Sequence, residues 1–429
     1  MASTADSPRP RRTRAGRFYA GLLISPVIAA ILVSAAVAKY SGGSGSPADP
    51  YQIGTPEDLA TLGNTPDDWD GQFVLVKDID LTGYSEKNFH LIGGWVGFGA
   101  ADNKPFSGMF DGKGRTISNL SFRDTDSRAY VGLFRYINNG EVNNLKLVNM
   151  KITGNGMSTG ALAGYLEAGA IVNCHAAGIN VTGNTQVGGL VGYVGGAVAQ
   201  CSSRGQVAGI RYVGGLVGNI SEGTVARSYS KATVSGDESV GGLAGATVNQ
   251  ASIIDSCYAT GKVRGGAGVG GLVGLAAQGR IFKCYSTGAV TGDQNVGGLT
   301  GEVMFFGEVI ISFWDKEASG QTKSSGGTGR TTAEMRSADT YSSWDFNLTW
   351  ASICEGLHTP VFLWQIPLGD LRCPDGVSIL DFAWFALQWE RADCGAVNSS
   401  CEWADLDESG DVGYRDLAIF AENWLTGLD

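Results

Sequence analysis

Five oxygen-bearing side chains near the C-terminus have the spacing of a metal-binding loop. They occupy positions 1, 3, 5, 7 and 12 of a twelve-residue segment and are Asp405, Asp407, Ser409, Asp411 and Asp416. Such oxygens are the hard ligands that Ca²⁺ prefers, and Gly410 at position 6 permits the sharp turn that wraps them around an ion. Position 7 would ligate through its backbone carbonyl. We predict a Ca²⁺ site here; the alternative is a solvated acidic turn.

An earlier segment of the same length, residues 370–381, departs from this pattern. Arg372 occupies position 3, Pro374 occupies position 5, and Gly376 stands at position 7 instead of 6. The carboxylates left for a cation are those of Asp370, Asp375 and Asp381. We expect this loop to be a weaker metal site or metal-free.

Each loop precedes an apolar segment with helical periodicity, ILDFAWFALQW after the first and YRDLAIFAENWL after the second. One helix per loop, and Asp instead of Glu at position 12, resemble the dockerin arrangement and not a regulatory EF-hand. The resemblance implies a small α-helical module over residues 368–429. It also implies Ca²⁺ as cofactor and, as partner, a cohesin-like or other envelope protein bound by the helix faces.

The eight cysteines fall into two groups. One group lies in the loop-rich C-terminal region and comprises Cys354, Cys373, Cys394 and Cys401. Four cysteines allow three pairings, among which the sequence does not choose. Because so short a core needs support, we expect at least one disulfide in this module.

The middle of the chain consists of repeats. The hexapeptide VGGLVG or a close relative begins at Val187, Val213, Val240, Val269 and Val296. A second landmark, Cys-x-x-x-Gly-x-Val or a relative, begins at Cys174, Cys201, Ser228, Cys257 and Cys284, with spacings of 27, 27, 29 and 27 residues. A fixed period of this length, with strand-type residues and no helical run, predicts one solenoid coil per repeat. We therefore expect a mainly β fold, a right-handed parallel β-solenoid (β-helix).

Stacking the repeats predicts the direction of each column of side chains. Two columns are expected to face inward, Val198, Val225, Ile254 and Ile281, and Val207, Val234, Val263 and Val290. The landmark cysteines should form an interior row of free thiols, because parallel neighbours one strand spacing apart, about 4.8 Å, are poorly placed for disulfides. The Gly-Gly pair of VGGLVG should make a corner and let neighbouring coils approach closely.

The column after the cysteines points outward and includes Tyr229, Tyr258 and Tyr285. Stacked tyrosines could form a ligand strip for a sugar or a peptide. The alternative is aromatic stacking that only stabilises adjacent coils.

These repeats resemble the GLUG family, named for its Gly-Leu-x-Gly core, and the resemblance extends over about residues 51–367. Near its start, GTPEDLATLGN predicts a capping helix with Thr55 as N-cap, Pro56 at the first position and Asp58 at the third. The resemblance implies a cap and opening coils over residues 39–156, regular repeats over 157–305, and a closing coil and cap over 306–367.

Regions similar to these repeats occur in bacterial surface proteins and in immunoglobulin-A-cleaving metalloproteases. The chain has three histidines, His90, His175 and His358, and no His-Glu-x-x-His motif. That excludes transfer of the protease activity.

The N-terminus has the pattern of an export signal. Arginines are frequent between residues 9 and 17, residues 18–38 are apolar, and Ala36-Val37-Ala38 offers the small residues of a cleavage site. We expect a signal peptide cleaved before Lys39. A retained membrane anchor is the alternative, since the apolar segment is long enough to span a bilayer.

The formal net charge of −11 argues against a nucleic-acid partner. We expect an exported, non-catalytic protein, secreted or in the cell envelope: an adhesin-like or scaffold-associated solenoid that displays a binding surface, with polysaccharide as a further candidate ligand.

The alternative is a polysaccharide-active lyase or glycoside hydrolase, which needs positioned carboxylates. The one cluster that could supply them comprises Asp102, Asp111, Asp124 and Asp126. We expect these acids to serve turns and assign no catalytic residue.

Overall fold

The computed structural model describes residues 39–97, 100–124, 130–351, 356–373, 376–395 and 399–427. The expected signal peptide or anchor, residues 1–38, lies outside this part of the chain. Among the helices of the described residues, none combines the length and the hydropathy that a membrane span requires.

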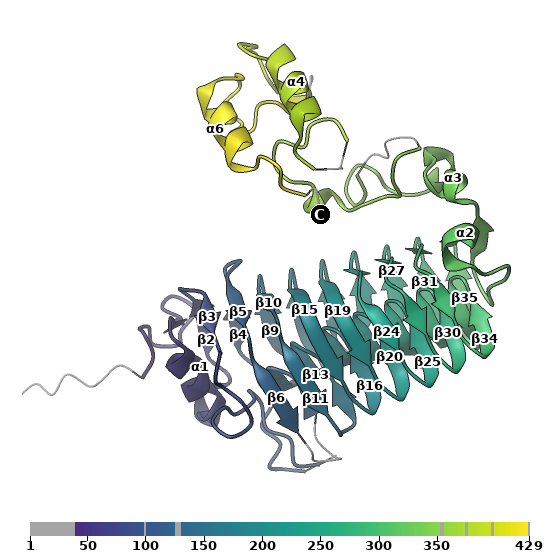
Figure 1. Cartoon of the computed structure of the whole chain (residues 1–429). Coiled ribbons are helices and arrows are strands. Elements are labelled where there is room, and N and C mark those ends of the chain that lie inside the picture. Colours follow the sequence, from purple (N-terminus) through teal and green to yellow (C-terminus); the bar gives the residue numbers. More distant parts are fainter. Residues whose placement is uncertain are drawn as a thin grey trace, which may run out of the picture. The chain divides into compact units, whose positions relative to one another are not determined.

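The repeats form a parallel β-solenoid whose coils stack side by side between the α1 end and β34 and β35 (Figure 1). Every strand-to-strand pairing in the described residues is parallel, as between β17 and β21. The strands belong to three sheets.

The first sheet contains β1 (Tyr51–Ile53), β2 (Gln72–Leu75), β4 (Met109–Asp111), β9 (Gly140–Asn143), β14 (Gly169–Val172), β18 (Ala197–Ala199), β22 (Thr224–Ala226), β27 (Ile253–Asp255), β31 (Val273–Phe282), β26 (Ala244–Thr247), β21 (Val217–Ile220), β17 (Val191–Val194), β13 (Ala163–Leu166), β8 (Phe134–Ile137) and β35 (Thr300–Ile310). The second sheet contains β3 (Ile79–Asp80), β5 (Thr116–Ser118), β10 (Lys146–Val148), β15 (His175–Thr182), β19 (Ser202–Ala208), β23 (Tyr229–Ser230), β28 (Tyr258–Ala259), β32 (Tyr285–Ser286), β36 (Phe313–Asp315), β37 (Thr328–Arg330), β6 (Ser121–Asp124), β11 (Lys151–Gly154), β24 (Thr233–Ser235), β29 (Val263–Arg264) and β33 (Val290–Thr291). The third sheet contains β34 (Gln294–Gly297), β30 (Ala267–Gly270), β25 (Glu238–Gly241), β20 (Arg211–Gly214), β16 (Thr185–Gly188), β12 (Ser158–Thr159) and β7 (Tyr130–Val131).

The predicted registers are confirmed. Val198 pairs with Val225, Val225 with Ile254, and Ile254 with Ile281. In the other inward column Val207 pairs with Val234, which continues to Val263 and Val290. Both columns are buried in one continuous core, so the interior is a stack of apolar rungs.

The Gly-Gly pair is required by close packing of neighbouring coils. A Cβ on Gly241 would lie 2.0 Å from the carbonyl oxygen of Ala244 and 2.7 Å from the backbone nitrogen of Gly274 in the next coil. The equivalent glycines at 188, 214 and 270 face the same obstruction. A Cβ on Gly297 would lie 2.1 Å from the carbonyl oxygen of Thr300 and 2.9 Å from the Cα of Ser324. The coil corner is therefore too narrow for any side chain.

A second corner precedes each cysteine position, and non-glycine residues form it. Residues 173, 200, 227, 256 and 283 all have φ between 47° and 54°. A left-handed residue here turns the chain before the next strand begins. Nothing in the residue types at these positions other than Asn173 signals this conformation.

The N-terminal cap is the predicted helix, α1 (Pro56–Gly63). Thr55 and Asp58 form a capping box: the Asp58 amide donates to Thr55 Oγ1 at 3.1 Å, and the Thr55 amide donates to Asp58 Oδ2 at 3.0 Å.

Beyond the last coil the chain forms α2 (Lys316–Ser319) and then the closing segment, defined as residues 332–351 and 356–367, which begins with α3 (Thr332–Met335). Its aromatic residues and Met335 form a separate apolar cluster with the outward side chains of the second sheet. The members from the closing segment are Met335, Tyr341, Trp344, Trp350 and Phe362.

The C-terminal module has its own core and contains α4 (Ile379–Leu387), α5 (Ser399–Glu402) and α6 (Tyr414–Glu422). Its buried apolar side chains include Val377, Phe385, Val412 and Phe420. The disulfide expected in this region is present between Cys394 and Cys401. Cys373 is also disulfide-bonded, and Cys354 lies outside the described residues.

Candidate functional site

The predicted calcium loop brings three carboxylates together. One oxygen from each of Asp405, Asp407 and Asp416 lies within 4.8 Å of the other two. Asp405 and Asp416 are buried. Three negative charges at this separation repel one another, and a hard divalent cation would offset that repulsion.

Backbone amides hold the loop in its curved form. The amide of Ser409 donates to Asp405 Oδ1, and that of Gly410 donates to Asp405 Oδ2, both at 3.0 Å. Gly410 has φ = 95°, the left-handed turn expected at position 6. The Ser409 hydroxyl at position 5 donates to the carbonyl oxygen of Asp411 at position 7, at 3.3 Å, so these two predicted ligand oxygens lie close together.

The Asp416 carboxylate has too few free lone pairs to bind an ion at position 12 through both of its oxygens. Its Oδ1 accepts from the amides of Leu406 and Asp407 at 2.6 and 3.0 Å, and Oδ2 accepts from the amide of Gly413 at 2.8 Å. A carboxylate oxygen has about two lone-pair directions, so Oδ2 keeps one for a metal. The residues fit Ca²⁺, with Asp416 as a single-oxygen ligand.

The earlier loop repeats this framework 35 residues upstream. Asp381 Oδ1 accepts from the amides of Leu371 and Arg372, as Asp416 Oδ1 does from Leu406 and Asp407. Asp370 Oδ2 accepts from the amide of Gly376 at 2.9 Å. The two acids that shape a calcium loop are thus present.

Position 3 of the earlier loop differs. The Arg372 guanidinium lies 6.0 Å from the ring centre of Trp384 and brings a positive charge to the position that Asp407 occupies in the other loop. Asp375, the third predicted ligand, lies outside the described residues. Metal binding by Asp370, Asp375 and Asp381 stays a prediction.

The tyrosines of the second sheet stack as expected, but the exposed ligand strip is wrong for two of the three. Successive rings of Tyr229, Tyr258 and Tyr285, called the tyrosine ladder below, have centroids 4.9 Å apart and nearly parallel planes. The closing segment covers the last two, which are 2% and 1% exposed. These side chains point away from the solenoid core and are buried by a segment from later in the chain.

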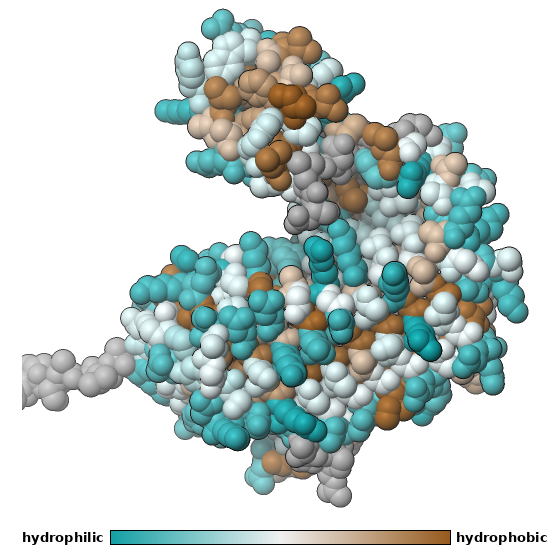
Figure 2. Space-filling view, viewed as in Figure 1, coloured by the Kyte–Doolittle hydropathy of each residue, from teal (hydrophilic) through white to brown (hydrophobic). Residues whose placement is uncertain are grey.

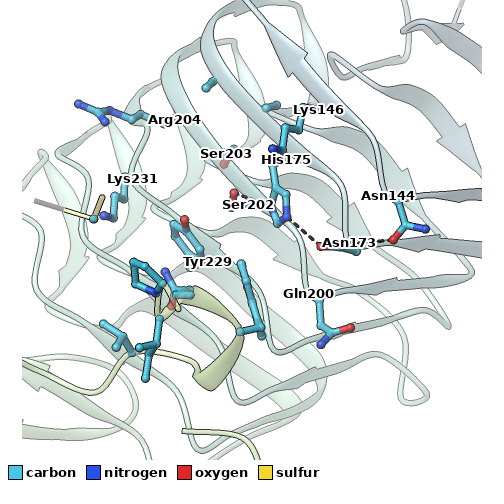
Figure 3. A pocket seen from close by; sticks show the side chains of 18 of the residues that line it. Asn144, Lys146, Asn173, His175, Gln200, Ser202, Ser203, Arg204, Tyr229 and Lys231 are labelled. Carbon is cyan, nitrogen blue, oxygen red and sulfur yellow. Dashed lines mark hydrogen bonds between the residues drawn. The ribbon is translucent and has the colours of Figure 1, made fainter. Parts of the chain in front are cut away.

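Next to the covered part of the tyrosine ladder a groove is open (Figure 3). His175 lies in it, with Nε2 3.0 Å from Asn173 Oδ1 and Nδ1 3.0 Å from Ser202 Oγ. Because Asn173 Oδ1 only accepts, Nε2 carries the proton and Nδ1 accepts from the serine hydroxyl. Asn173 Nδ2 in turn donates to Asn144 Oδ1 at 2.8 Å, so the bonds run in one direction across the coils.

Burial, together with the nearby charge of Lys146, lowers the pKa of His175 to about 4. A histidine of such low basicity is a poor proton acceptor at neutral pH. The contact with Ser202 therefore fixes both side chains in place and does not activate a nucleophile.

The landmark cysteines are buried free thiols, as predicted, at Cys174, Cys201, Cys257 and Cys284. The row includes serines: the Cys201 amide donates to Ser228 Oγ at 3.0 Å, and the Cys284 amide donates to Ser312 Oγ at 3.1 Å. Burial raises the pKa of the Cys174 and Cys257 thiols well above the usual value.

The carboxylates of the opening coils are separately paired. Asp111 forms an ion pair with Lys113 at 2.8 Å, and Asp124 with Arg135 at 3.1 Å. Asp102 is exposed, and Asp126 lies outside the described residues. Asp111 and Asp124 therefore have structural partners, and the described acids of this cluster are not brought together as a pair.

Known proteins share the repeats and the fold. The GLUG motif model matches residues 236–264 and 265–291. The chain carries GLUG repeats. Halomucin of Haloquadratum walsbyi is 33% identical over 207 residues, which is 41% of this chain and 2% of halomucin. A "Putative Gly-rich membrane protein" of Evansella cellulosilytica is 37% identical over 128 residues, which is 29% of this chain and 14% of that protein.

The GLUG-repeat chain thus spans only a small share of these two curated relatives. Among solved structures, that of "a putative immunoglobulin A1 protease from Bacteroides ovatus" is similar, with a TM-score of 0.52 and 20% identity over 76% of this chain and 96% of the other. At that identity the likeness shows the β-solenoid fold alone.

Proposed function

We propose that this protein is an exported, non-catalytic surface protein whose C-terminal module binds Ca²⁺ and attaches the solenoid to an envelope protein. The observation that carries the proposal is the apolar surface of α4. Ile379, Leu380 and Leu387 are exposed, at 65%, 57% and 72%, while Phe385 packs in the core. A helix that is apolar on more than its core face is typical of a protein interface.

The surface of the module supports this reading. In Figure 2 hydrophobic residues gather on the module, whereas on the visible face of the solenoid they are scattered among hydrophilic ones. Trp403, Tyr414 and Leu425 extend the exposed apolar set beyond α4. Aromatic and large aliphatic side chains of this kind are enriched where proteins bind each other.

Calcium would affect this surface by fixing the position of α6 relative to the loop. Asp416 is both a predicted ligand and the third residue of α6, and its carboxylate also holds the amides of Leu406 and Asp407. Binding of an ion would fix the start of α6 relative to the loop. Attachment is therefore expected to depend on Ca²⁺.

The relatives support a surface location. One relative is named a Gly-rich membrane protein, and that protein and halomucin are 37% and 33% identical to parts of this chain. The solenoid would serve as a rigid body that displays residues along its length, because each coil is fixed by its two neighbours.

The test combines calcium titration with capture of envelope proteins by the purified protein. We expect Ca²⁺ binding by calorimetry, and capture of an envelope protein in Ca²⁺ that is lost in chelator. Asp405→Asn with Asp407→Asn should abolish both. Leu387→Glu should abolish capture and leave Ca²⁺ binding intact, and its matched control is the exposed Leu348→Glu in the closing segment. Equal capture in Ca²⁺ and in chelator contradicts the proposal.

A further inference from the structure

The groove beside the closing segment has an aromatic wall. The Trp364 ring stacks on His175 with centroids 5.3 Å apart and on Tyr229 with centroids 5.8 Å apart, and the planes are inclined by less than 30° in both pairs. Trp364 comes from the closing segment, and the other two rings come from adjoining coils of the second sheet. Flat aromatic faces with partial exposure suit the C–H faces of sugar rings.

Polar groups in fixed positions surround these rings. Figure 3 shows Asn173 and Gln200 on one side of Tyr229 and Arg204 and Lys231 on the other. The hydrogen bonds from His175 through Asn173 to Asn144 hold the amide side chains in place. Preorganised amides beside half-buried aromatic rings suit the recognition of hydroxyl groups.

The charge of the groove is opposite to that of the whole protein. The residues that line it include three cations, Lys146, Arg204 and Lys231, and one carboxylate, that of Asp370. The groove is therefore net positive, whereas the chain has a formal net charge of −11. None of the three cations has an ion-pair partner among the described residues.

Two of these cations are forced close together. Arg204 and Lys231 each follow one residue after Ser203 and Ser230, which are paired in register on β19 and β23. The two side chains therefore occupy neighbouring rungs, roughly 5 Å apart at the backbone. Like charges on adjacent rungs are unfavourable without an anion.

We infer that this groove binds an acidic polysaccharide, with the sugar rings against Trp364 and Tyr229 and the carboxylates on Arg204 and Lys231. An acidic peptide would satisfy the cations but would leave the stacked aromatic wall and the amide row without a role. This inference rests on the proposed display function of the solenoid and not on calcium binding. Asp370, Gly376 and Gly427 of the C-terminal module also line the groove.

The test measures binding of hexagalacturonate to the purified protein by calorimetry, with the fully methyl-esterified hexamer as the uncharged match. We expect binding of the acid form, little binding of the ester, and an affinity that falls as salt concentration rises. Arg204→Gln with Lys231→Gln should weaken binding about tenfold or more, since each exposed charge contact contributes up to about a factor of five.

The matched control is Lys151→Gln with Lys262→Gln, which removes the same charge from two exposed lysines of the second-sheet region outside the groove. Trp364→Leu should weaken binding of the acid form while calcium binding is unchanged. The inference would be overturned if the acid and the ester bound equally or if the lysine control lost as much affinity. It would also be overturned if hexaglutamate bound as tightly as hexagalacturonate. So would failure of hexagalacturonate to bind at millimolar concentration, and that result would leave the calcium-dependent attachment untouched.

Discussion

The Tyr285 hydroxyl donates to the carbonyl oxygen of Pro360 at 2.6 Å, across 75 positions of the sequence. This bond ties the closing segment to the last rungs of the tyrosine ladder. Tyr258 makes a similar tie, with its hydroxyl 2.8 Å from Gln365 Nε2. The outward face of the second sheet is thus a docking surface for the protein's own later residues.

Removing the Tyr285 hydroxyl should loosen that docking. Tyr285→Phe leaves the buried Pro360 carbonyl without its donor, which costs about 1–3 kcal/mol, and Tyr285→Ala should cost about 3–5 kcal/mol because the ring is fully buried. Urea denaturation followed by tryptophan fluorescence measures both. The half-buried Tyr212 lies on the third sheet, and Tyr212→Phe should have little effect. An equal loss in both Phe variants contradicts the docking role.

The glycine corner should not accept a methyl group. Gly241→Ala places a Cβ within 2.7 Å of backbone atoms in its own coil and in the next, so relief requires the coils to separate. We expect a loss of about 3 kcal/mol or more, seen as a large fall in melting temperature. Gly94→Ala meets atoms only at 3.5 Å or beyond and is the matched control. A melting temperature unchanged in Gly241→Ala would show that the corner is not tightly packed.

Much of the solenoid could be predicted because the same sequence pattern occurs in each coil. The position of Val225 is fixed by Val198 and Ile254 above and below it, so five copies of one pattern determined the sheet registers. The left-handed corner at Gln200, Arg227 and Lys283 could not be predicted, since those residue types have no preference for positive φ and the neighbouring coils impose it.

The burial of the tyrosine ladder could not be predicted for a related reason. Its outward direction follows from the strand alternation. The residues that cover it, such as Trp350 and Phe362, lie 65 to 104 positions after Tyr258 and Tyr285, in a segment without a repeat. A clue was present in the unusual number of aromatic residues after residue 340. The groove at His175 is bounded by the same segment, because Trp364 stacks on His175.

The thiols of the solenoid should be inert in the folded protein. Burial raises the pKa of Cys174 and Cys257, so the thiolate needed for alkylation is absent at pH 8. We expect no iodoacetamide labelling of Cys174, Cys201, Cys257 and Cys284 in the native state and full labelling in guanidinium, read by peptide mass. Rapid native labelling of any of the four contradicts the buried row.

These raised thiol pKa values also give stability a pH dependence. Above the ordinary thiol pKa of about 8.5 the unfolded chain releases protons that the folded chain keeps. The contribution of Cys174 and Cys257 to the free energy of unfolding is therefore fully present below that pH. It falls as pH rises, by about 1.4 kcal/mol per pH unit for each of these two thiols. Denaturation at pH 7.5 and 9.5 measures this, and Cys257→Ser, which places at 257 the residue found at 228, should reduce the slope.

His175 should make the stability of the protein depend on pH in acid solution. Its pKa of about 4 lies below the ordinary value of 6.5, so the unfolded chain takes up a proton first as pH falls, and stability decreases between those two values. Imidazole NMR signals should show that His175 stays neutral at pH 5.5, and His175→Asn identifies the signal. Protonation of His175 at pH 6 would show that the ring is not enclosed by Trp364 and Ser202.

Two acids in the calcium loop should respond differently to the same substitution. Asp407 contributes a carboxylate oxygen to the cluster with Asp405 and Asp416, so Asp407→Asn should weaken Ca²⁺ binding roughly tenfold or more. Asp411 stands at position 7, where the ligand is the backbone carbonyl, and Asp411→Asn should change the affinity little although it removes the same charge. Calorimetric titration of the two variants separates a defined coordination site from a merely acidic turn, because general electrostatic attraction would weaken equally in both.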